Sequence, residues 1–466
     1  MIGNLFGYFL MMSGCSGDKL DSSDTSEPIP EEIEAHANCI FQDPTTDDKT
    51  SFAYSSGTSW GNEENGFFAA VGDPGYNDSD GAIYVIPCDD SSLIARILGT
   101  EGGTNFFGFN IGLSEDEEFV FTNSDRGGYA LSTAELQDLA SEGGDYSIDG
   151  VKNTVKLNVT ERGKFYAQDF LTSLDIDGDG KNDLLVTYPN DKVLAVYPGL
   201  SSDSSVTEVD PVWVYENLCD QDSSSDAASE QNCGTKLVQV GESSILLNAP
   251  GKGIYTYSFD DVRKYGDYDF ITNTGIFLGE SLGSLWEEED LFANDMEVFS
   301  EAEMASFEID PDRCTGENIV LTNAGDAGGL VLLCPFSLLE EPAFKYINVA
   351  SGYDLGYSIE RFTTADEIDG VSDIIMGINV PNKSYDGGAT KGFGFLFNLD
   401  LMNRDGLTLE DEDAYSLLTP YDTDSRGLYY ASSLIATSSG DALILSTGTH
   451  GRAERVVLTT SMTKED

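Results

Sequence analysis

Seven stretches of this sequence repeat one pattern, in which an apolar run ends in Gly, Pro or Asn and a second apolar run follows. Alternating residues on both sides of such a turn predict a β-hairpin. The hairpins recur every ~50–75 residues, which is typical of propeller blades with variable loops. The pattern therefore predicts an all-β fold made of one repeated unit. The stretches run from Phe67 to Cys88, Glu117 to Ser132, Asp183 to Gly199, Ser243 to Phe259, Asn318 to Phe336, Asp373 to Leu399 and Asp441 to Thr460.

An additional strand rich in aromatic residues and glycine precedes several of the hairpins. A fourth strand for each unit is expected from the segment that leads to the next one, such as Leu93 to Leu98. The composition agrees, since 11% aromatic residues and 49 Gly favour strands and tight turns. Four such preceding strands run from Asn105 to Leu113, Lys164 to Leu174, Asp354 to Phe362 and Gly427 to Ile435.

The order of these elements resembles the FG-GAP repeat of integrin α chains and bacterial surface proteins. Phe107-Gly108 and Leu355-Gly356 stand at the FG position, and the resemblance covers about Phe41 to Thr460. It implies a seven-bladed β-propeller over residues 39–466. The last blade then lacks an outer strand, which we expect the segment around Cys39 to Gln42 to supply. Three segments stand at the GAP position: Val71-Gly72-Asp73-Pro74, Thr187-Tyr188-Pro189 and Asn248-Ala249-Pro250.

The loop DIDGDGKNDLL, from Asp175 to Leu185, predicts a calcium site. An EF-hand is excluded, because its twelfth loop position needs Glu where this loop has Val186, and because a strand follows instead of a helix. The loop resembles the calcium loops of FG-GAP blades, and the alternative is an acidic turn that holds no ion. The expected ligands are the carboxylates of Asp175, Asp177, Asp179 and Asp183 and the backbone carbonyl of Lys181.

Three other loops give weaker metal signals. The loop with Glu367, Asp369 and Asp373 has Ala365 in place of the leading aspartate. The loop with Asp310 and Asp312 has Cys314 where a third carboxylate is needed. The third segment, with Asp145, Ser147, Asp149 and Asn153, lies outside the position where the family binds metal.

The N-terminus predicts export. Met1 to Met12 is almost wholly apolar, which is too short to span a bilayer but suits a signal peptide. Met12-Ser13-Gly14-Cys15 resembles a bacterial lipobox, which implies residues 1–15 as a signal peptide and lipidation at Cys15, with a plain signal peptide or a short buried segment as alternatives. Ser16 suits sorting to the outer membrane. Residues 16–38, rich in Ser, Asp, Glu and Pro, are expected to form a disordered, flexible tether.

The cysteine count agrees with export. The chain has seven cysteines, and removing Cys15 leaves an even set, which suggests disulfides in an exported protein. Six cysteines permit 15 pairings, and some could remain buried thiols. The favoured scheme joins nearest neighbours: Cys39–Cys88, Cys219–Cys233 and Cys314–Cys334.

The charge excludes some partners. The chain has 83 acidic and 24 basic residues, a net charge of −59, so nucleic acid and anionic membrane surfaces are poor partners. We interpret some carboxylates as cation ligands and most as a solvated surface.

Catalysis has little support in the sequence. The two histidines, His36 and His450, cannot build a zinc cluster, and Ser281 in GESLG lacks the strand-turn-helix context of a nucleophile elbow. We therefore expect a non-enzymatic binding or adhesion module for a protein or glycan partner, with the insertions Asp220 to Asn232 and Tyr265 to Glu308 as candidate contact surfaces. The alternative is a secreted polysaccharide hydrolase or lyase that uses carboxylates on the propeller face.

Overall fold

The chain divides into two units, residues 1–30 and 31–466, and every described residue belongs to the second. The structure is a computed structural model. It describes residues 32–42, most of 52–259 and, beyond 259, the strands alone. The gaps within 52–259 are 54–55, 63–64, 89–92, 100–105, 125–126, 159–166, 168, 203–205, 217, 219–232, 241–243 and 250–252. None of the described residues forms a helix with the length and apolarity that crossing a bilayer requires.

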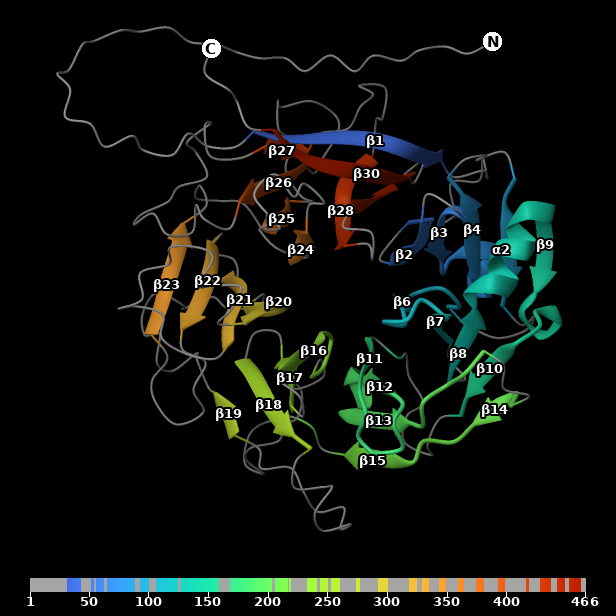
Figure 1. Ribbon diagram of the computed structural model, residues 1–466, viewed down its shortest axis with the longest axis horizontal. Coiled ribbons are helices and arrows are strands. Elements are labelled where there is room, and N and C mark those ends of the chain that lie inside the picture. The colour runs from blue at the N-terminus through green and yellow to red at the C-terminus, as the bar shows by residue number, and fades with distance from the viewer. Residues whose placement is uncertain are drawn as a thin grey trace, which may run out of the picture. The chain divides into compact units, whose positions relative to one another are not determined.

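The strands form seven sheets of four or five strands, which we number along the chain (Figure 1). Sheets 1 to 3 have the following order. Sheet 1 is β2 (Gly57–Asn62), β3 (Gly66–Asp73), β4 (Ala82–Pro87), β5 (Ala95–Leu98) and β9 (Gly144–Ser147). Sheet 2 is β6 (Ile111–Leu113), β7 (Phe119–Ser124), β8 (Gly127–Ser132), β10 (Thr154–Leu157) and β14 (Glu208–Val209). Sheet 3 is β11 (Phe170–Leu174), β12 (Asp183–Tyr188), β13 (Val193–Tyr197) and β15 (Trp213–Glu216).

Sheets 4 to 7 each have four strands. Sheet 4 is β16 (Leu237–Val240), β17 (Ser244–Ala249), β18 (Gly253–Ser258) and β19 (Thr274–Ile276). Sheet 5 is β20 (Phe292–Ser300), β21 (Asn318–Ala324), β22 (Gly329–Cys334) and β23 (Ala343–Asn348). Sheet 6 is β24 (Ile359–Thr363), β25 (Ile374–Val380), β26 (Phe393–Asn398) and β27 (Ser416–Leu418). Sheet 7 is β28 (Leu428–Ala436), β29 (Ala442–Gly448), β30 (Arg452–Ser461) and β1 (Glu32–Gln42).

All seven expected hairpins are present, each as the second and third strands of a sheet. The first strand of each sheet, which we call the inner strand, lies toward the middle of Figure 1. Inner strands of successive sheets contact one another from β2 through β6, β11, β16, β20 and β24 to β28, and β28 contacts β2. The first four strands of each sheet pair antiparallel, and β9 and β14 add to sheets 1 and 2 by parallel pairing. Four-stranded antiparallel sheets with inner strands in this arrangement form a β-propeller.

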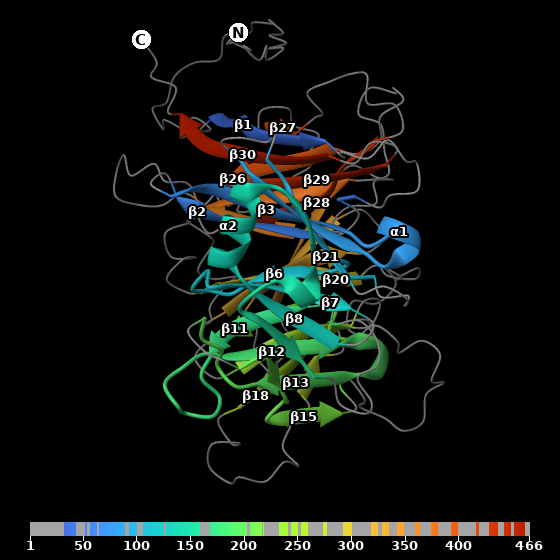
Figure 2. The same cartoon turned by 90° about the vertical axis from the view of Figure 1, so that its right-hand side faces the viewer.

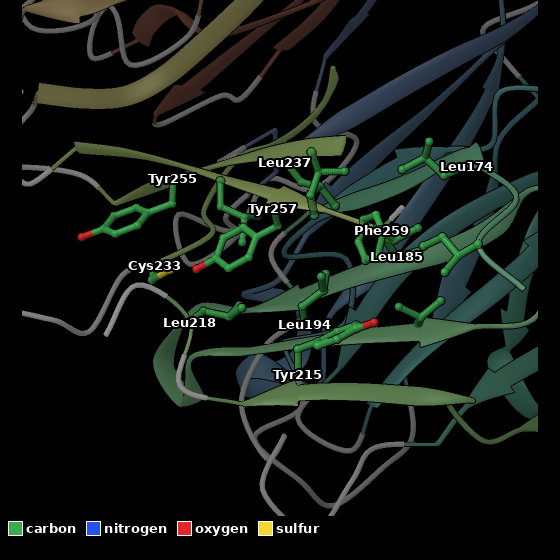
Figure 3. Packing of buried hydrophobic residues seen from close by; sticks show 14 of the residues in the cluster. Leu174, Leu185, Leu194, Tyr215, Leu218, Cys233, Leu237, Tyr255, Tyr257 and Phe259 are labelled. Atoms are coloured by element: carbon green, nitrogen blue, oxygen red, sulfur yellow. The ribbon is translucent and has the colours of Figure 1, made fainter. Parts of the chain in front are cut away.

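The central strands of a sheet are buried on both faces, because another sheet packs against each side. Every residue of β12 and of β13 is buried. An apolar cluster fills the space between sheets 3 and 4 (Figure 3). Leu185 and Leu194 contribute to it from sheet 3, and Leu237 and Tyr257 contribute from sheet 4. The β-rich sequence thus buries its apolar residues between sheets.

Sheets 1 and 2 approach so closely that two glycines are required at their contact. Gly108 has φ +81°, a conformation that favours glycine, and a Cβ there would lie 2.5 Å from the carbonyl oxygen of Ala82. A Cβ on Gly72 would overlap the carbonyl oxygen of Gly108. These glycines belong to the segments expected at the GAP and FG positions.

Sheet 7 combines the two ends of the described chain. β1 pairs antiparallel with β30, from Glu32 opposite Ser461 to Gln42 opposite Arg452. A strand around Cys39 to Gln42 was expected here, but β1 begins at Glu32, so residues 32–38 are not tether. Without this segment β30 would have an unpaired edge. The segment pairs with that edge, although its composition alone suggested a linker. His36, also expected in the tether, lies opposite Val457.

Short helical segments lie between some of the strands along the chain. Figure 2 shows α2 (Thr133–Glu142), which follows β8. It contacts β4 and β5, and Leu136 and Ala140 are buried. The others are α1 (Tyr76–Ser79) and the 3₁₀ turns η1 (Ile148–Gly150) and η2 (Pro189–Asp191). The hairpin pattern did not predict α2, because it lies in an insertion between strands of the repeat.

Candidate metal centre

The acidic loop lies between two strands of sheet 3. Asp175 directly follows β11, and Asp183 is the first residue of β12. Strands on both sides agree with the exclusion of an EF-hand. Gly178 and Gly180 have φ +78° and +88°, so the chain turns sharply between the aspartates.

Carboxylates inside the loop fix its backbone. The N–H of Gly178 donates to Oδ1 of Asp175 over 2.7 Å, and the N–H of Gly180 donates to Oδ2 of the same side chain over 3.1 Å. The N–H of Asp179 donates to Oδ1 of Asp177 over 2.9 Å. The N–H of Lys181 donates to Oδ1 of Asp179 over 2.8 Å. The alternating aspartates therefore set the shape of the loop as well as its charge.

Asp183 is the buried member of the group. Its Oδ2 accepts hydrogen bonds from the N–H groups of Ile176 (2.8 Å) and Asp177 (3.0 Å), and its Oδ1 accepts one from Gly199 (3.1 Å). Burial raises the pKa of Asp183 to about 6, although these N–H donors act in the opposite direction. A carboxylate that is desolvated and close to other carboxylates is stabilised by a bound cation.

Asp175, Asp177 and Asp183 each place one carboxylate oxygen within 4.8 Å of the others. Oxygen atoms at this separation suit a hard cation such as Ca²⁺, which takes six to eight oxygen ligands. Asp179 and Lys181, the other expected ligands, are exposed and stand outside this group of three. The structure thus brings together three of the four expected carboxylates.

A neighbouring loop that sequence reasoning missed contacts the acidic loop of sheet 3. In sheet 2, Glu115 lies between β6 and β7, and its Oε2 accepts a hydrogen bond from Nδ2 of Asn182 over 3.1 Å. The N–H of Glu115 donates to Oγ1 of Thr172 over 2.9 Å. The acidic run SEDEE between two predicted strands was the available signal, because it occupies the same place in its repeat as the aspartate loop.

The weaker metal signal at Asp145 does not form a site in the described residues. Asp145 lies in β9, where Nε of Arg96 donates to its Oδ1 over 3.0 Å and a second guanidinium nitrogen contacts its Oδ2. Asp149 lies in η1. The ion pair therefore neutralises the carboxylate that was expected to bind metal. The other candidates, Glu367, Asp369, Asp373, Asp310, Asp312, Ser281 and His450, lie outside the described residues.

One of the three expected disulfides has both of its cysteines among the described residues. Cys39 and Cys88 form a disulfide, with Cα atoms 5.0 Å apart. Cys233 is also disulfide-bonded. Cys15, Cys219 and Cys314 lie outside the described residues, so the pairing of Cys219 with Cys233 and of Cys314 with Cys334 stays a prediction.

Comparisons with known proteins find similar structures but no related sequence. No family model matches the chain. No curated protein matches it either. The C-terminal WD40 domain of Sif2 has a TM-score of 0.46 and 10% identity, covering 91% of this chain and 99% of that one.

Two further similar structures are bacterial. A DUF4221 member from Bacteroides vulgatus has a TM-score of 0.40 and 9% identity, covering 92% of this chain and 99% of that one. The extracellular domain of a putative one-component system from B. thetaiotaomicron has a TM-score of 0.40 and 10% identity, covering 90% of this chain and 42% of that one. No residue role is transferred from these proteins, so the metal centre rests on its own geometry.

Proposed function

We propose that the chain is an exported calcium-binding β-propeller of FG-GAP type with seven blades, which acts as a binding or adhesion module for a protein or glycan partner. Seven sheets, and inner strands that contact one another from β2 to β28 and back to β2, support seven blades in a ring. Sheet 7, which pairs β1 with β30, supports closure by both ends of the chain.

The FG-GAP type is supported by the contact between sheets 1 and 2. Gly108, from the FG segment, packs against Gly72, from the GAP segment, without room for a side chain on either. At the third GAP-type segment, Oδ1 of Asn248 accepts a hydrogen bond from the N–H of Lys236, just before β16, over 2.6 Å. The first contact joins the end of β3 to the residues before β6 in the next sheet, whereas the second lies within sheet 4, between β17 and the residue before β16.

The observation that carries the calcium proposal is the convergence of Asp175 and Asp177 on the buried Asp183. In this proposal these three residues bind Ca²⁺ through carboxylate oxygens, and Asp179 and the Lys181 carbonyl complete the shell. The ion offsets the repulsion between the carboxylates and fixes the loop at the edge of sheet 3.

Calorimetric titration of Ca²⁺ into metal-stripped protein tests the site. We expect binding by the native chain, loss of binding in Asp183→Asn, and unchanged binding in Asp149→Asn, whose carboxylate is exposed and outside the loop. Equal calcium affinity in all three proteins would contradict the proposal.

Export is supported by the Cys39–Cys88 disulfide, since such bonds persist in oxidising compartments. We propose lipidation of Cys15, which would anchor the ring to the outer membrane or cell surface; without it, the protein would be secreted. Mass spectrometry of the mature N-terminus tests this, with Cys15→Ser as the unlipidated control. An unmodified Cys15 would remove the anchor from the proposal.

The binding role rests on a rigid ring of sheets that presents loops of different length, an arrangement in which recognition is commonly placed on the loops. A glycan array probed with the purified chain, with Ca²⁺ or with a chelator, tests the glycan partner. A parallel polysaccharide-hydrolysis screen tests the alternative. Turnover that is abolished by one Asp or Glu substitution would replace the binding role with a catalytic one.

A further inference from the structure

Polar groups on or beside the inner strands join several sheets to the next. Among the described residues, five hydrogen bonds pair a side chain of one sheet with backbone of the following sheet, between sheets 1 and 2, 2 and 3, 3 and 4, 5 and 6, and 6 and 7. The bonds are Ser56 Oγ to Phe109 O (2.8 Å), Asn110 Nδ2 to Ala167 O (2.9 Å), Leu237 N to Asp169 Oδ2 (2.6 Å), Ile359 N to Asp295 Oδ2 (2.8 Å) and Ala436 N to Glu360 Oε2 (3.4 Å).

The links change character along the chain. From sheet 1 to sheet 3 they use the neutral side chains of Ser56 and Asn110, and from sheet 3 onward they use carboxylates. A hydrogen bond to a carboxylate is stronger than a neutral one, but the carboxylate must be desolvated to form it. The carboxylates that make these links, Asp169, Asp295 and Glu360, are therefore concentrated beside the inner strands of sheets 3 to 6.

Lys236, just before β16, joins sheet 4 to two further sheets. Its Nζ lies 3.3 Å from Oδ1 of Asp295 in β20 and 3.6 Å from Oε1 of Glu360 in β24. The side chains of Lys236, Asp295 and Glu360 are 25%, 8% and 16% exposed, so water screens these pairs poorly. A single ammonium group thus links the inner strands of sheets 4, 5 and 6.

The cluster holds more carboxylates than cations. Asp169, Asp295, Glu297 and Glu360 interact with the charge of Lys236 from the start of β11, from β20 and from β24. Among the described residues, the other cation is Arg361, which interacts with Glu297 and lies over the ring of Phe299 at 5.9 Å. Four carboxylates against two cations leave an excess of two negative charges when all six groups are ionised. We call these six charged residues the axial cluster.

Burial and the excess of carboxylates shift the pKa values of groups in the axial cluster. Burial, together with the neighbouring carboxylates, raises the pKa of Asp169 to about 6 and raises the pKa of Glu297 and Glu360 as well. Burial acts to lower the pKa of Lys236, but Asp295, Glu360 and the other carboxylates raise it. Lys236 therefore remains charged wherever the carboxylates are ionised.

We propose that the axial cluster is a proton-responsive lock, in which Lys236 holds the inner strands of sheets 4, 5 and 6 together against repulsion between their carboxylates. Proton uptake by Asp169, Glu297 and Glu360 relieves the same repulsion. The contacts between these inner strands are most stable in mildly acidic solution, and the contribution of Lys236 to their stability grows as the pH rises. The inference uses the β-propeller fold and goes beyond the calcium and partner proposals.

The test is the unfolding of the full chain and its variants at about pH 5 and about pH 8, at fixed ionic strength. We expect Lys236→Met to lose several degrees of Tm at the higher pH and much less at the lower pH. Lys236→Arg, which keeps the charge, should lose less than Lys236→Met at the higher pH. Lys152→Met is the control, because Lys152 is 82% exposed, and its Tm should follow the native Tm at both values.

A loss of Tm that is the same at both pH values would mean that Lys236 acts by packing alone, and it would overturn the lock. Glu297→Gln provides a second test if Lys236→Met does not fold. Removing one surplus negative charge should raise Tm at about pH 8 and change it little at about pH 5; a lower Tm at the higher pH would overturn the proposal. Repeating each comparison in chelator separates the lock from calcium binding at the sheet 3 loop.

Discussion

Cys39 in β1 is joined by a disulfide to Cys88, the residue that follows β4. The bond connects the outer strand of sheet 7 to sheet 1 across a sequence separation of 49. It fastens covalently the strand that pairs with the C-terminal strand β30, and sheet 7 is where the two ends of the described chain meet.

Replacing both Cys39 and Cys88 with Ser should lower the free energy of unfolding by about 2–4 kcal/mol, because the unfolded chain regains the entropy that the closed loop removes. Urea unfolding of the native and variant proteins measures the difference. A variant with native stability would show that β1 stays paired without the disulfide.

Calcium should stabilise the native chain through the loop that ends at Asp183. Calcium at 100 times its Kd is expected to add about 2.7 kcal/mol to the free energy of unfolding. Asp177→Asn should lose most of this gain, since it removes a negative charge from the three converging carboxylates. Thermal unfolding with calcium or chelator measures the gain, and Asp149→Asn should retain it. A gain that is equal in Asp177→Asn would place the ion elsewhere.

The sequence predicted the hairpins well, because alternation and turn residues act locally. The strands β12 and β13 lie where the repeat around Asp183 placed them, and the segment near Cys39 forms the outer strand of sheet 7. The early start of β1 was missed because its pairing depends on the distant strand β30. Tertiary pairing overrode a composition that is typical of linkers.

The loop at Asp175 could also be found in the sequence, since its carboxylates are near neighbours along the chain. The axial cluster could not, because Asp169, Lys236, Asp295 and Glu360 come from four different sheets. Their separation along the chain is large, and only the position of each inner strand brings them together. Charged residues are so frequent in this sequence that no local pattern marks these four.

Gly108→Ala should destabilise the chain, because its φ of +81° and the carbonyl oxygen of Ala82 both oppose a side chain. Strain of this kind costs on the order of 1–3 kcal/mol. Gly150→Ala is the matched control, since a Cβ there meets nothing within 4 Å. Chemical unfolding of the two variants measures the difference. Equal stability of the variants would mean that sheets 1 and 2 can separate to admit a methyl group.

The carboxyl group of Asp169 should make the chain less stable as the pH rises from about 4 to about 6. Burial raises its pKa in the folded chain to about 6, above the value of about 3.9 for an unfolded chain, so the folded state binds the extra proton in this interval. Its contribution to stability is complete below the unfolded pKa and is lost as the pH passes the folded pKa.

Asp169→Asn should remove this part of the pH dependence, because an amide does not titrate in this range. Its single oxygen can accept from the N–H of Leu237, while the hydrogen bond from the N–H of Phe170 is lost at every pH. Relative to its own value at about pH 4, the variant should lose roughly 1–2 kcal/mol less stability than the native chain by about pH 7. Urea unfolding at several pH values in chelator measures the slope without a contribution from calcium. Asp149→Asn should keep the native slope. A slope in Asp169→Asn as steep as in the native chain would show that Asp169 titrates alike in the folded and unfolded states.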